Sequence, residues 1–368
     1  MKSILLSCLT ALLVVALVGC DQMDTVDETS TSEVAWTMDA PFALDATSKN
    51  GPASYLGSLI SFPLGESVEG IAIDRRGNMY VGKRTWGAST ISQIVRVERD
   101  GTASLVADLP TSGPGTTGVL GLVTDPSGRV YAAMVTDDPS TQGVYRISKD
   151  GLTVERLPGS EQIAFANALT FDRDGNLYVT DSFTGKIWQY GQGSFTEWLQ
   201  HPLLEAVPVP GAPAAIPGAN GIAFYPPNKL YVANTSQFSI TRVYIEDDRS
   251  AGAVESIVPF DFGLFAVDGI ALDAHEMIYG VLAPANAEET GAPPVPPVVT
   301  VDPATGTVGV LIPDPSNFDT PTSLAFGTGG AWGRKTLYVA NAALYGPVTN
   351  GPGSGVVEVY AGIPGLPN

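Results

Sequence analysis

The sequence predicts an all-β fold, a six-bladed β-propeller with four-stranded blades. A similar phrase recurs six times: a residue of variable type, a small residue, an apolar strand, a turn, and a second strand centred on Tyr. The copies begin at Glu69, Leu120, Asn167, Asn220, Asp268 and Thr322, at intervals of 47 to 54 residues. A period of this size, made of strand patterns with no helical stretch between them, is typical of a propeller in which each repeat forms one blade.

The beginning of the chain has the pattern of an export signal. A charged start is followed by an apolar run from Ile4 to Val18, too short for a comfortable membrane span. The tetrad ending in Cys20 resembles the lipobox of bacterial lipoproteins, in which the cysteine is lipidated. The alternative is an ordinary secretory signal or a short anchor helix. We expect a signal peptide at 1–19 and an exported protein held by its lipid on the periplasmic or outer face of a bacterial membrane.

The rest of the chain divides into a tether and one large domain. Residues 20–52 are rich in Asp, Glu, Ser and Thr and lack strand periodicity, which indicates a flexible acidic tether. Residues 53–368 then form the propeller, because six blades of about 50 residues account for that length without a second domain. The two cysteines, Cys8 and Cys20, both precede this domain, so it has no disulfide.

The charge balance excludes one class of partner. The chain has a formal net charge of −19, with 38 acidic and 19 basic residues. Nucleic acids and anionic lipids need clustered Lys and Arg, so we expect neither as a partner and predict membrane contact through the lipid anchor only. The acidic surface is compatible with cation binding, and solubility explains it equally well.

Each repeat can be divided into four short strands. In the third copy we expect strands at 168–172, 176–180, 186–190 and 195–199. Turns such as 172–176 combine Asp with Gly, which is hairpin chemistry. This turn also resembles the start of an EF-hand calcium loop, but it lacks the distal Glu of such a loop, so the turn interpretation is preferred.

The last repeat lacks its fourth strand. The chain supplies strands at 323–326, 336–341 and 355–360 and then ends within a few residues. Residues 54–62, ahead of the first repeat, have the apolar pattern of an outer strand. We expect this segment to complete the last blade, because an open ring would expose sheet edges.

The first residue of each repeat carries the prediction of function. Equivalent residues of successive inner strands lie at one height around a propeller channel, so Glu69, Asn167, Asn220 and Asp268 are expected to converge. Two carboxylates and two amides at one axis repel or stay unsatisfied unless something lies between them. Such oxygen ligands favour Ca²⁺, with Mg²⁺ as the next choice. The alternative is that the four side chains hydrogen-bond one another and channel water.

These residues resemble a known family, the senescence-marker-protein (SMP-30), gluconolactonase and luciferin-regenerating-enzyme group of six-bladed propellers. There a Glu opens the first blade, one blade is passed over, and Asn, Asn and Asp follow at blade intervals and hold one divalent metal. Glu69, Asn167, Asn220 and Asp268 reproduce that order. The later phrases Asn-Gly-Ile-Ala-Phe (220–224) and Asp-Gly-Ile-Ala-Leu-Asp (268–273) also look like those of the family.

The departures from the family bear on the substrate. Sugar-lactone members have an Arg two residues before the Asn of the third blade and an Asp after it, where this chain has Phe165 and Ala168. The resemblance therefore implies the metal site but not gluconolactone as substrate. Phe165 and Trp86 are candidate apolar walls for a ligand, with core packing as their alternative. His201 is a candidate at the channel mouth, with a surface position as its alternative.

Two functions are consistent with the sequence. The first is a calcium-dependent hydrolase of a lactone or related ester, in which the cation polarises the carbonyl and Asp268 deprotonates a water. The second is a non-catalytic propeller that binds a protein or small ligand, with a structural cation. Both occur on propellers, so the fold does not choose between them. A Gly-x-Ser-x-Gly elbow and a phosphate-binding Gly loop are absent, which argues against serine-hydrolase and nucleotide functions.

Overall fold

The computed structural model describes residues 53–63, 65–85, 92–110, 118–136, 138–209, 216–259, 266–283, 295–344 and 351–366. The predicted signal peptide, Cys20, the tether up to residue 52 and Trp86 lie outside these residues. Within the described ranges, no helix is long and apolar enough to cross a membrane.

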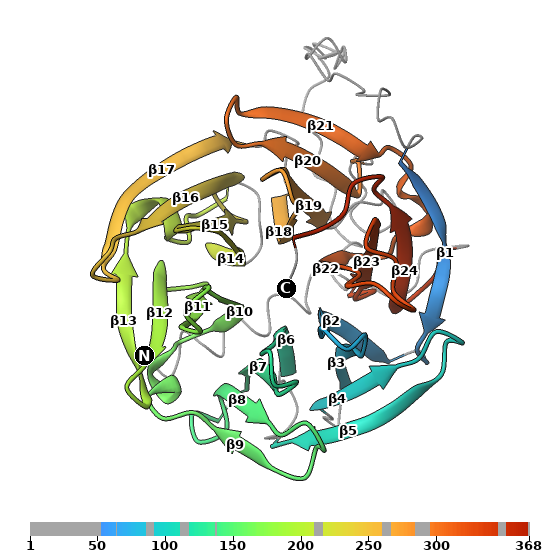
Figure 1. Ribbon diagram of the computed structural model, residues 1–368, viewed down its shortest axis with the longest axis horizontal. Helices are drawn as coiled ribbons and strands as arrows, with labels where there is room; N and C mark the ends of the chain where they lie inside the picture. The colour runs from blue at the N-terminus through green and yellow to red at the C-terminus, as the bar shows by residue number, and fades with distance from the viewer. Residues whose placement is uncertain are drawn as a thin grey trace, which may run out of the picture.

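Six antiparallel sheets of four strands surround a central axis, so the predicted six-bladed propeller is confirmed (Figure 1). Blade 1 contains β2 (Glu66–Ile73), β3 (Met79–Thr85), β4 (Ser92–Val97) and β5 (Ala103–Leu109); blade 2 contains β6 (Gly118–Thr124), β7 (Val130–Val135), β8 (Gly143–Ile147) and β9 (Val154–Arg156). Blade 3 contains β10 (Ala166–Phe171), β11 (Leu177–Asp181), β12 (Lys186–Gly191) and β13 (Ser194–Gln200).

Blade 4 contains β14 (Ala219–Tyr225), β15 (Lys229–Asn234), β16 (Ser239–Ile245) and β17 (Ala251–Pro259); blade 5 contains β18 (Ala266–Leu272), β19 (Ile278–Ala283), β20 (Val298–Asp302) and β21 (Thr307–Ile312). Blade 6 contains β22 (Pro321–Phe326), β23 (Thr336–Asn341), β24 (Gly355–Tyr360) and β1 (Ser54–Ser61). Three short 3₁₀ turns, η1 (Ser160–Gln162), η2 (Pro202–Leu204) and η3 (Pro315–Asn317), lie between blades.

Blade 6 combines the two ends of the described chain. The strand β1 pairs with β24 in antiparallel register from Ser54–Tyr360 to Ser61–Gly355. Just beyond it, the Phe62 N–H donates to Ser354 O at 2.8 Å. Blade 6 thus has its fourth strand, supplied by the segment that precedes blade 1 in the sequence.

The hydrophobic core is divided among the six blade interfaces. Each buried cluster contains residues from two neighbouring blades, such as Ile94 with Met134 between blades 1 and 2 and Tyr231 with Leu282 between blades 4 and 5. The strand alternation explains this, because successive side chains of a strand point to opposite faces of the sheet and each face of a blade packs on a neighbour. Apolar burial therefore holds the blades in a fixed order around the axis.

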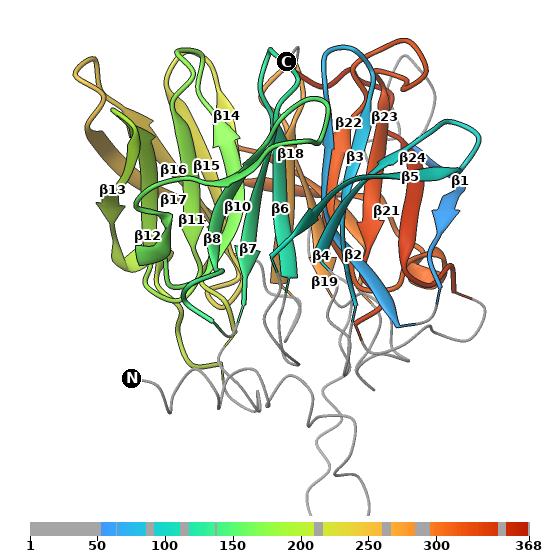
Figure 2. The ribbon, with the colours of Figure 1, turned by 90° about the horizontal axis from the view of Figure 1, so that it is seen from below.

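Aspartates organise the turns between the first and second strands of the blades. In blade 3, Asp172 Oδ1 accepts from the N–H groups of Asp174 and Asn176 at 2.9 and 2.8 Å. Asp74, Asp125 and Asp273 make the same pair of bonds in blades 1, 2 and 5. The turn interpretation of residues 172–176 is confirmed. These turns define one end of the channel, which we call the turn face (Figure 2).

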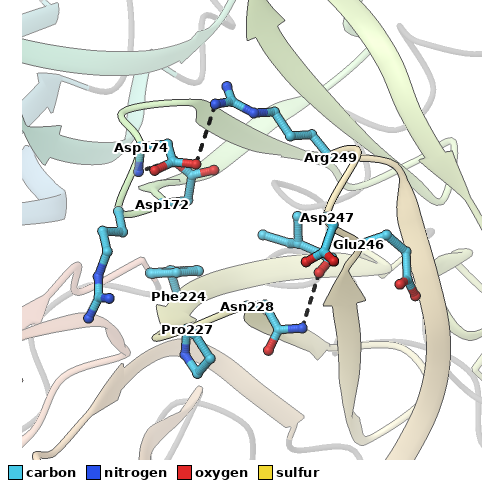
Figure 3. Close-up of a pocket in the computed structure, with 10 residues that line it drawn as sticks. Asp172, Asp174, Phe224, Pro227, Asn228, Glu246, Asp247 and Arg249 are labelled. Atoms are coloured by element: carbon cyan, nitrogen blue, oxygen red, sulfur yellow. Dashed lines mark hydrogen bonds and ion pairs between the residues drawn. The ribbon is translucent and has the colours of Figure 1, made fainter.

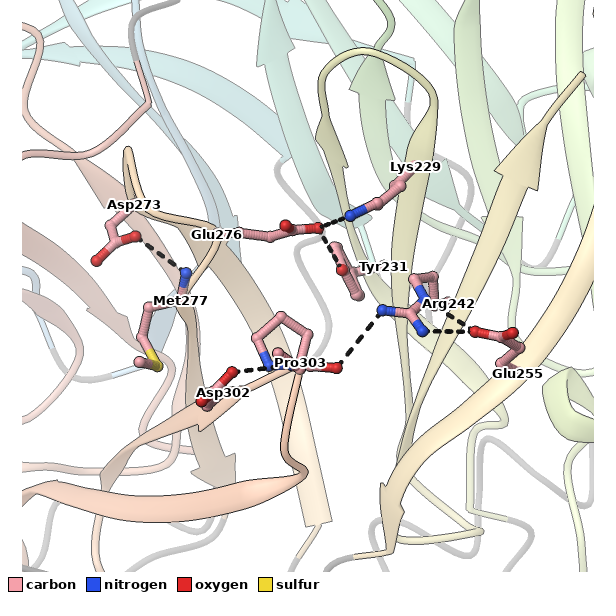
Figure 4. Close-up of polar contacts among 10 residues, drawn as sticks. Lys229, Tyr231, Arg242, Glu255, Asp273, Glu276, Met277, Asp302 and Pro303 are labelled. Carbon is pink, nitrogen blue, oxygen red and sulfur yellow. Dashed lines mark hydrogen bonds and ion pairs between the residues drawn. The ribbon is translucent and has the colours of Figure 1, made fainter.

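Polar contacts join neighbouring blades near the turn face. Glu276, in the turn of blade 5, accepts from Lys229 Nζ at 2.5 Å and from Tyr231 Oη at 2.7 Å, both in blade 4 (Figure 4). Between blades 6 and 1, Trp332 Nε1 donates to Gly77 O at 2.8 Å. These bonds add polar contacts between neighbouring blades to the apolar packing of their faces.

Small residues allow the inner strands to approach closely at the channel. A Cβ added to Gly121 would lie 2.2 Å from Asn167 O, and one added to Gly221 would lie 2.4 Å from Asp268 O. Each of these glycines follows the variable residue of its own repeat and contacts the backbone of the variable residue in the next blade. The small residue of the repeated phrase is therefore required by blade packing.

Candidate metal centre

The four predicted ligands occupy one structural position in their blades. Glu69, Asn167, Asn220 and Asp268 lie near the start of the inner strands β2, β10, β14 and β18, at the end of the channel opposite the turn face. In each of these four strands, the predicted ligand lies where the pairing with the second strand is irregular, as at a β-bulge. In blade 3 this irregularity falls between the pairs Ala166–Asp181 and Leu169–Val179. Such bulges redirect side chains, and here they do so at the same place in every blade.

The structure brings these side chains into one electrostatic environment. Glu69, Asn167 and Asn220 are buried, with 9%, 6% and 5% of their surface exposed, and Asp268 is half-buried. Burial and the negative charge of Glu69 both raise the pKa of Asp268, although the two residues are 199 positions apart in the chain. Leu120 and Thr322 have the same phase in blades 2 and 6, and both are buried.

Two hydroxyl groups determine how the amides are oriented. Asn167 Nδ2 donates to Ser182 Oγ at 3.0 Å, and Ser182 Oγ donates to Ala219 O at 2.7 Å. Asn220 Nδ2 donates to Thr235 Oγ1 at 3.0 Å, and Thr235 Oγ1 donates to Val267 O at 3.1 Å. Because each hydroxyl uses its proton on a carbonyl, it accepts from the amide and must face the NH₂ group. Both Oδ1 atoms are left without a donor from the described part of the chain, and are available to a ligand.

A positively charged side chain, that of Arg84, lies beside the carboxylates. Arg84, at the end of β3, is 3% exposed, and its Nη2 atom is 2.8 Å from Glu69 Oε2. Burial lowers the pKa of Arg84, and the charges of Glu69 and Asp268 act in the opposite direction. The guanidinium therefore forms an ion pair with Glu69 and also lies in the electrostatic field of Asp268. Removing one partner of such a buried pair typically costs about 3–5 kcal/mol, because the other charge stays buried without compensation.

Burial dominates the ionisation of the two acids. It raises the pKa of Glu69, and Arg84 opposes this shift. The pKa of Asp268 is raised well above its ordinary value by burial and by the charge of Glu69, while a hydrogen bond from the Asn220 side chain and the charge of Arg84 lower it. A carboxylate with a raised pKa is a stronger base, as general-base catalysis near neutral pH requires.

The donor set suits a hard divalent cation. Asn167 and Asn220 present amide oxygens, and Glu69 and Asp268 present carboxylates, which is the ligand chemistry of Ca²⁺. The described residues contain no group of three or more His, Cys, Asp or Glu side chains arranged for a metal, so the two amides are essential to any such site. The alternative, in which the four side chains hydrogen-bond one another, also has support, because the Asn220 side chain hydrogen-bonds Asp268.

The remaining candidates occupy different surroundings. Phe165 lies just before β10, and its ring packs edge-on against Phe183 with centroids 4.6 Å apart. His201 accepts from Leu203 N through Nδ1 at 3.2 Å and caps η2. Asp181 accepts from the N–H groups of Ala164 and Phe165, so it holds the loop that leads to Asn167.

A separate hollow lies on the turn face between blades 3 and 4. It has a volume of about 330 Å³ and is lined by Asp172, Asp174, Phe224, Asn228 and Arg249 among others (Figure 3). Two of its acidic groups have local partners: Asp172 accepts hydrogen bonds within its turn, and Asp174 lies 3.4 Å from Arg249 Nη2. It does not include the channel residues.

Three residues that contact the predicted ligands were not predicted from the sequence: Arg84, Ser182 and Thr235. Each lies 15 positions after the channel residue that it contacts, which are Glu69, Asn167 and Asn220 respectively. The hairpin geometry explains this constant interval, because a turn of fixed length places these positions side by side. In blades 2 and 5 the same interval reaches Val135 and Ala283, which cannot donate or accept through their side chains. The interval was a usable signal in the sequence.

Comparison with known proteins confirms the family resemblance over part of the chain. Residues 121–197 match the family model for the SMP-30/gluconolactonase/LRE-like region. No curated protein matches the chain.

Solved structures share the fold at low sequence identity. A gluconolactonase from Xanthomonas campestris is 16% identical, with a TM-score of 0.57 over 88% of this chain and 93% of its own. The calcium-binding protein regucalcin from Agrobacterium tumefaciens is 15% identical, with a TM-score of 0.57 over 85% and 95%. A luciferin-regenerating enzyme is also 15% identical, with a TM-score of 0.57 over 85% and 97%.

Proposed function

We propose that the protein is a calcium-dependent hydrolase of a lactone or related ester, acting at the end of the propeller channel opposite the turn face. One observation carries this proposal. Glu69, Asn220 and Asp268 interact there, Asn167 has the same position in its own inner strand, and Ser182 and Thr235 accept from the amide NH₂ groups, which leaves the amide oxygens available. The match of residues 121–197 to a family model that includes gluconolactonase supports the reaction class.

The channel residues would have distinct roles in metal binding and proton transfer. Glu69, Asn167, Asn220 and Asp268 would hold the cation, which when bound supplies a Lewis acid for the substrate carbonyl. Asp268 would accept the proton of the attacking water. Phe165 replaces the substrate-gripping Arg of sugar-lactone enzymes, which favours a less polar ester or lactone than gluconolactone.

The test combines calcium binding with turnover. Isothermal titration calorimetry of the domain from residue 53 with Ca²⁺ should show one site, and Asp268→Asn should bind Ca²⁺ more weakly. Hydrolysis of a panel of lactones and aryl esters should stop on addition of a chelator. In the variant at saturating Ca²⁺, kcat should fall by at least ~100-fold, the usual range for removing a general base. Wild-type protein that shows no heat with Ca²⁺ would exclude the metal site.

The second candidate is a binding module with a structural cation. Phe165 favours it, because the substrate-gripping Arg of sugar-lactone members is missing there, and the predicted lipid tether suits a receptor or scaffold. Calcium binding with no turnover of any substrate in the panel would support this candidate against the hydrolase.

The proposed location is the periplasmic or cell-surface face of a bacterial membrane, with the propeller attached through lipidated Cys20. The apolar run from Ile4 and the lipobox-like tetrad support this proposal. Labelling of expressing bacteria with a palmitate analogue should mark the wild-type chain and leave Cys20→Ser unmarked. Equal labelling of both chains would contradict it.

A further inference from the structure

Arg84 provides the channel with a positive charge of its own. Glu69 and Asp268 place two carboxylates at the site, and the guanidinium lies 2.8 Å from Glu69 while also interacting with Asp268. With 3% of its surface exposed, Arg84 is an interior residue. Its positive charge therefore lies beside the carboxylates that would also bind a divalent cation.

The side chain of Arg84 is packed into its position. A Cβ added to Gly118, at the start of β6, would lie 2.8 Å from Arg84 Cβ and 3.5 Å from Arg84 Cδ. Gly118 occupies in blade 2 the place that Phe165 has in blade 3, two residues before the channel position. The absence of a side chain at Gly118 leaves room for the arginine stem between blades 1 and 2.

We propose that Arg84 is an internal counter-ion that competes with the divalent cation for Glu69 and so sets the calcium affinity of the channel. This inference rests on the metal site of the proposed function. An oxygen of Glu69 is engaged by the guanidinium, so the cation must displace that contact to gain the full carboxylate. The two positive charges also repel each other strongly in a site from which water is largely excluded.

Arg84 would also stabilise Glu69 and Asp268 whenever no divalent cation is bound. Arg84 offsets part of their charge in the metal-free state, so calcium binding replaces one cation with another. Calcium affinity is then lower than four oxygen ligands alone would give. A site built this way responds to the calcium concentration instead of holding the ion permanently.

The experiment compares wild-type protein with Arg84→Met, which removes the charge and keeps most of the side-chain length. Arg146→Met is the matched control, because it makes the same change in net charge at a surface pair, Arg146 with Glu155 at 2.6 Å. Calcium dissociation constants are measured by calorimetry, and thermal unfolding is followed in EDTA and in excess Ca²⁺. Arg84→Met should bind Ca²⁺ about tenfold more tightly or better, and Arg146→Met should bind as wild type does.

Thermal unfolding gives a second readout that does not depend on catalysis. In EDTA, Arg84→Met should melt at a lower temperature than wild type, because its carboxylates lose their counter-ion. Excess Ca²⁺ should restore the melting temperature and produce a larger shift than in wild type. Folding that is seen only with Ca²⁺ would support the proposal in its strongest form. Arg84→Gln, which keeps a donor for Glu69 but no charge, should show the same tighter binding.

The ways in which the inference can fail are distinguishable. If wild type binds Ca²⁺ and Arg84→Met binds it no more tightly, the inference is wrong and the metal site stands. An equal gain in Arg146→Met would also overturn the inference, since the effect would then follow net charge. If neither the wild-type protein nor the Arg84→Met variant binds Ca²⁺, both the metal site and the inference are excluded. Failure of both Arg84 variants to fold in excess Ca²⁺ would overturn it as well, because the ion should replace the missing charge.

Discussion

The orientation of two amide side chains decides whether the channel can bind a cation. An Asn can present either its oxygen or its NH₂ group, and only the oxygen is a metal ligand. Ser182 and Thr235 settle the choice because each donates its proton to a carbonyl of the next blade, Ala219 O or Val267 O. The hydroxyls therefore connect the channel of one blade to the inner strand of its neighbour.

Replacing Ser182 with Ala should weaken calcium binding without unfolding the protein. The change removes the acceptor for Asn167 Nδ2, so the amide is free to rotate and its oxygen is no longer directed to the ligand. Groups that orient metal ligands typically contribute about 10–100-fold in affinity, and we expect a loss in this range by calorimetry. Thr196→Val, at an exposed position of β13, is the control and should bind as wild type does. Unchanged affinity in Ser182→Ala would show that the hydroxyl does not set the amide orientation.

Sequence reasoning found the channel residues but not the residues that support them. Glu69 and Asp268 could be selected because the repeat places them at one phase of successive inner strands. Arg84 was missed, because its relevance depends on the pairing of β2 with β3, which places Ser67 opposite Arg84. A buried Arg in the second strand of one repeat, absent from the others, is visible in the sequence only when the blades are aligned strand by strand.

The start of each inner strand must both direct the channel residue and allow the neighbouring blade to approach. The bulge in each inner strand directs the channel residue, and the small residue that follows admits the neighbouring blade. The sequence predicted an inner strand at 168–172 in blade 3, whereas β10 is Ala166–Phe171. The strand begins earlier because the bulged residues Asn167 and Ala168 interrupt the regular alternation on which the prediction relied. In blade 6 the predicted strands 336–341 and 355–360 agree with β23 and β24.

Replacing Gly221 with Ala should therefore destabilise the protein and disturb the channel. The added methyl group would lie 2.4 Å from Asp268 O, a distance that forces β14 and β18 apart. Overpacking of this kind typically costs about 1–3 kcal/mol, which denaturant unfolding can measure. Gly191→Ala is the matched control, because an added Cβ there has no atom within 4 Å. Equal stability of the two variants would contradict the close approach of the inner strands.

The whole ring depends on a segment that precedes its first blade. β1 supplies the outer strand of blade 6, and Tyr55, Leu59, Ile60 and Phe62 pack against the buried clusters on both sides of that blade. Without β1, the backbone groups of β24 would form an unpaired edge, which is a template for aggregation. The sequence could predict this partnership because blade 6 lacked a strand and residues 54–62 had the pattern of one.

Deleting residues 1–62 should thus abolish the monomeric fold, while deleting residues 1–52 should leave it intact. Both chains lack the predicted signal and tether, so the difference between them reports on β1. We expect the shorter chain to elute as aggregate in size-exclusion chromatography and to lose the cooperative thermal transition of the longer one. The physical cause is the loss of the β1–β24 ladder together with apolar burial beside Val357 and Val359.

A peptide of residues 53–63 tests whether β1 itself is the element that the shorter chain lacks. Added during refolding of the shorter chain, it should pair with β24 as a donated strand and recover a monomeric species with a cooperative transition. A peptide with Ile60 and Phe62 changed to Asp should not, because its side chains could not enter the interface shared by blades 6 and 1. A shorter chain that is as stable as the longer one would show that the ring closes without β1, and that blade 6 needs only its three C-terminal strands.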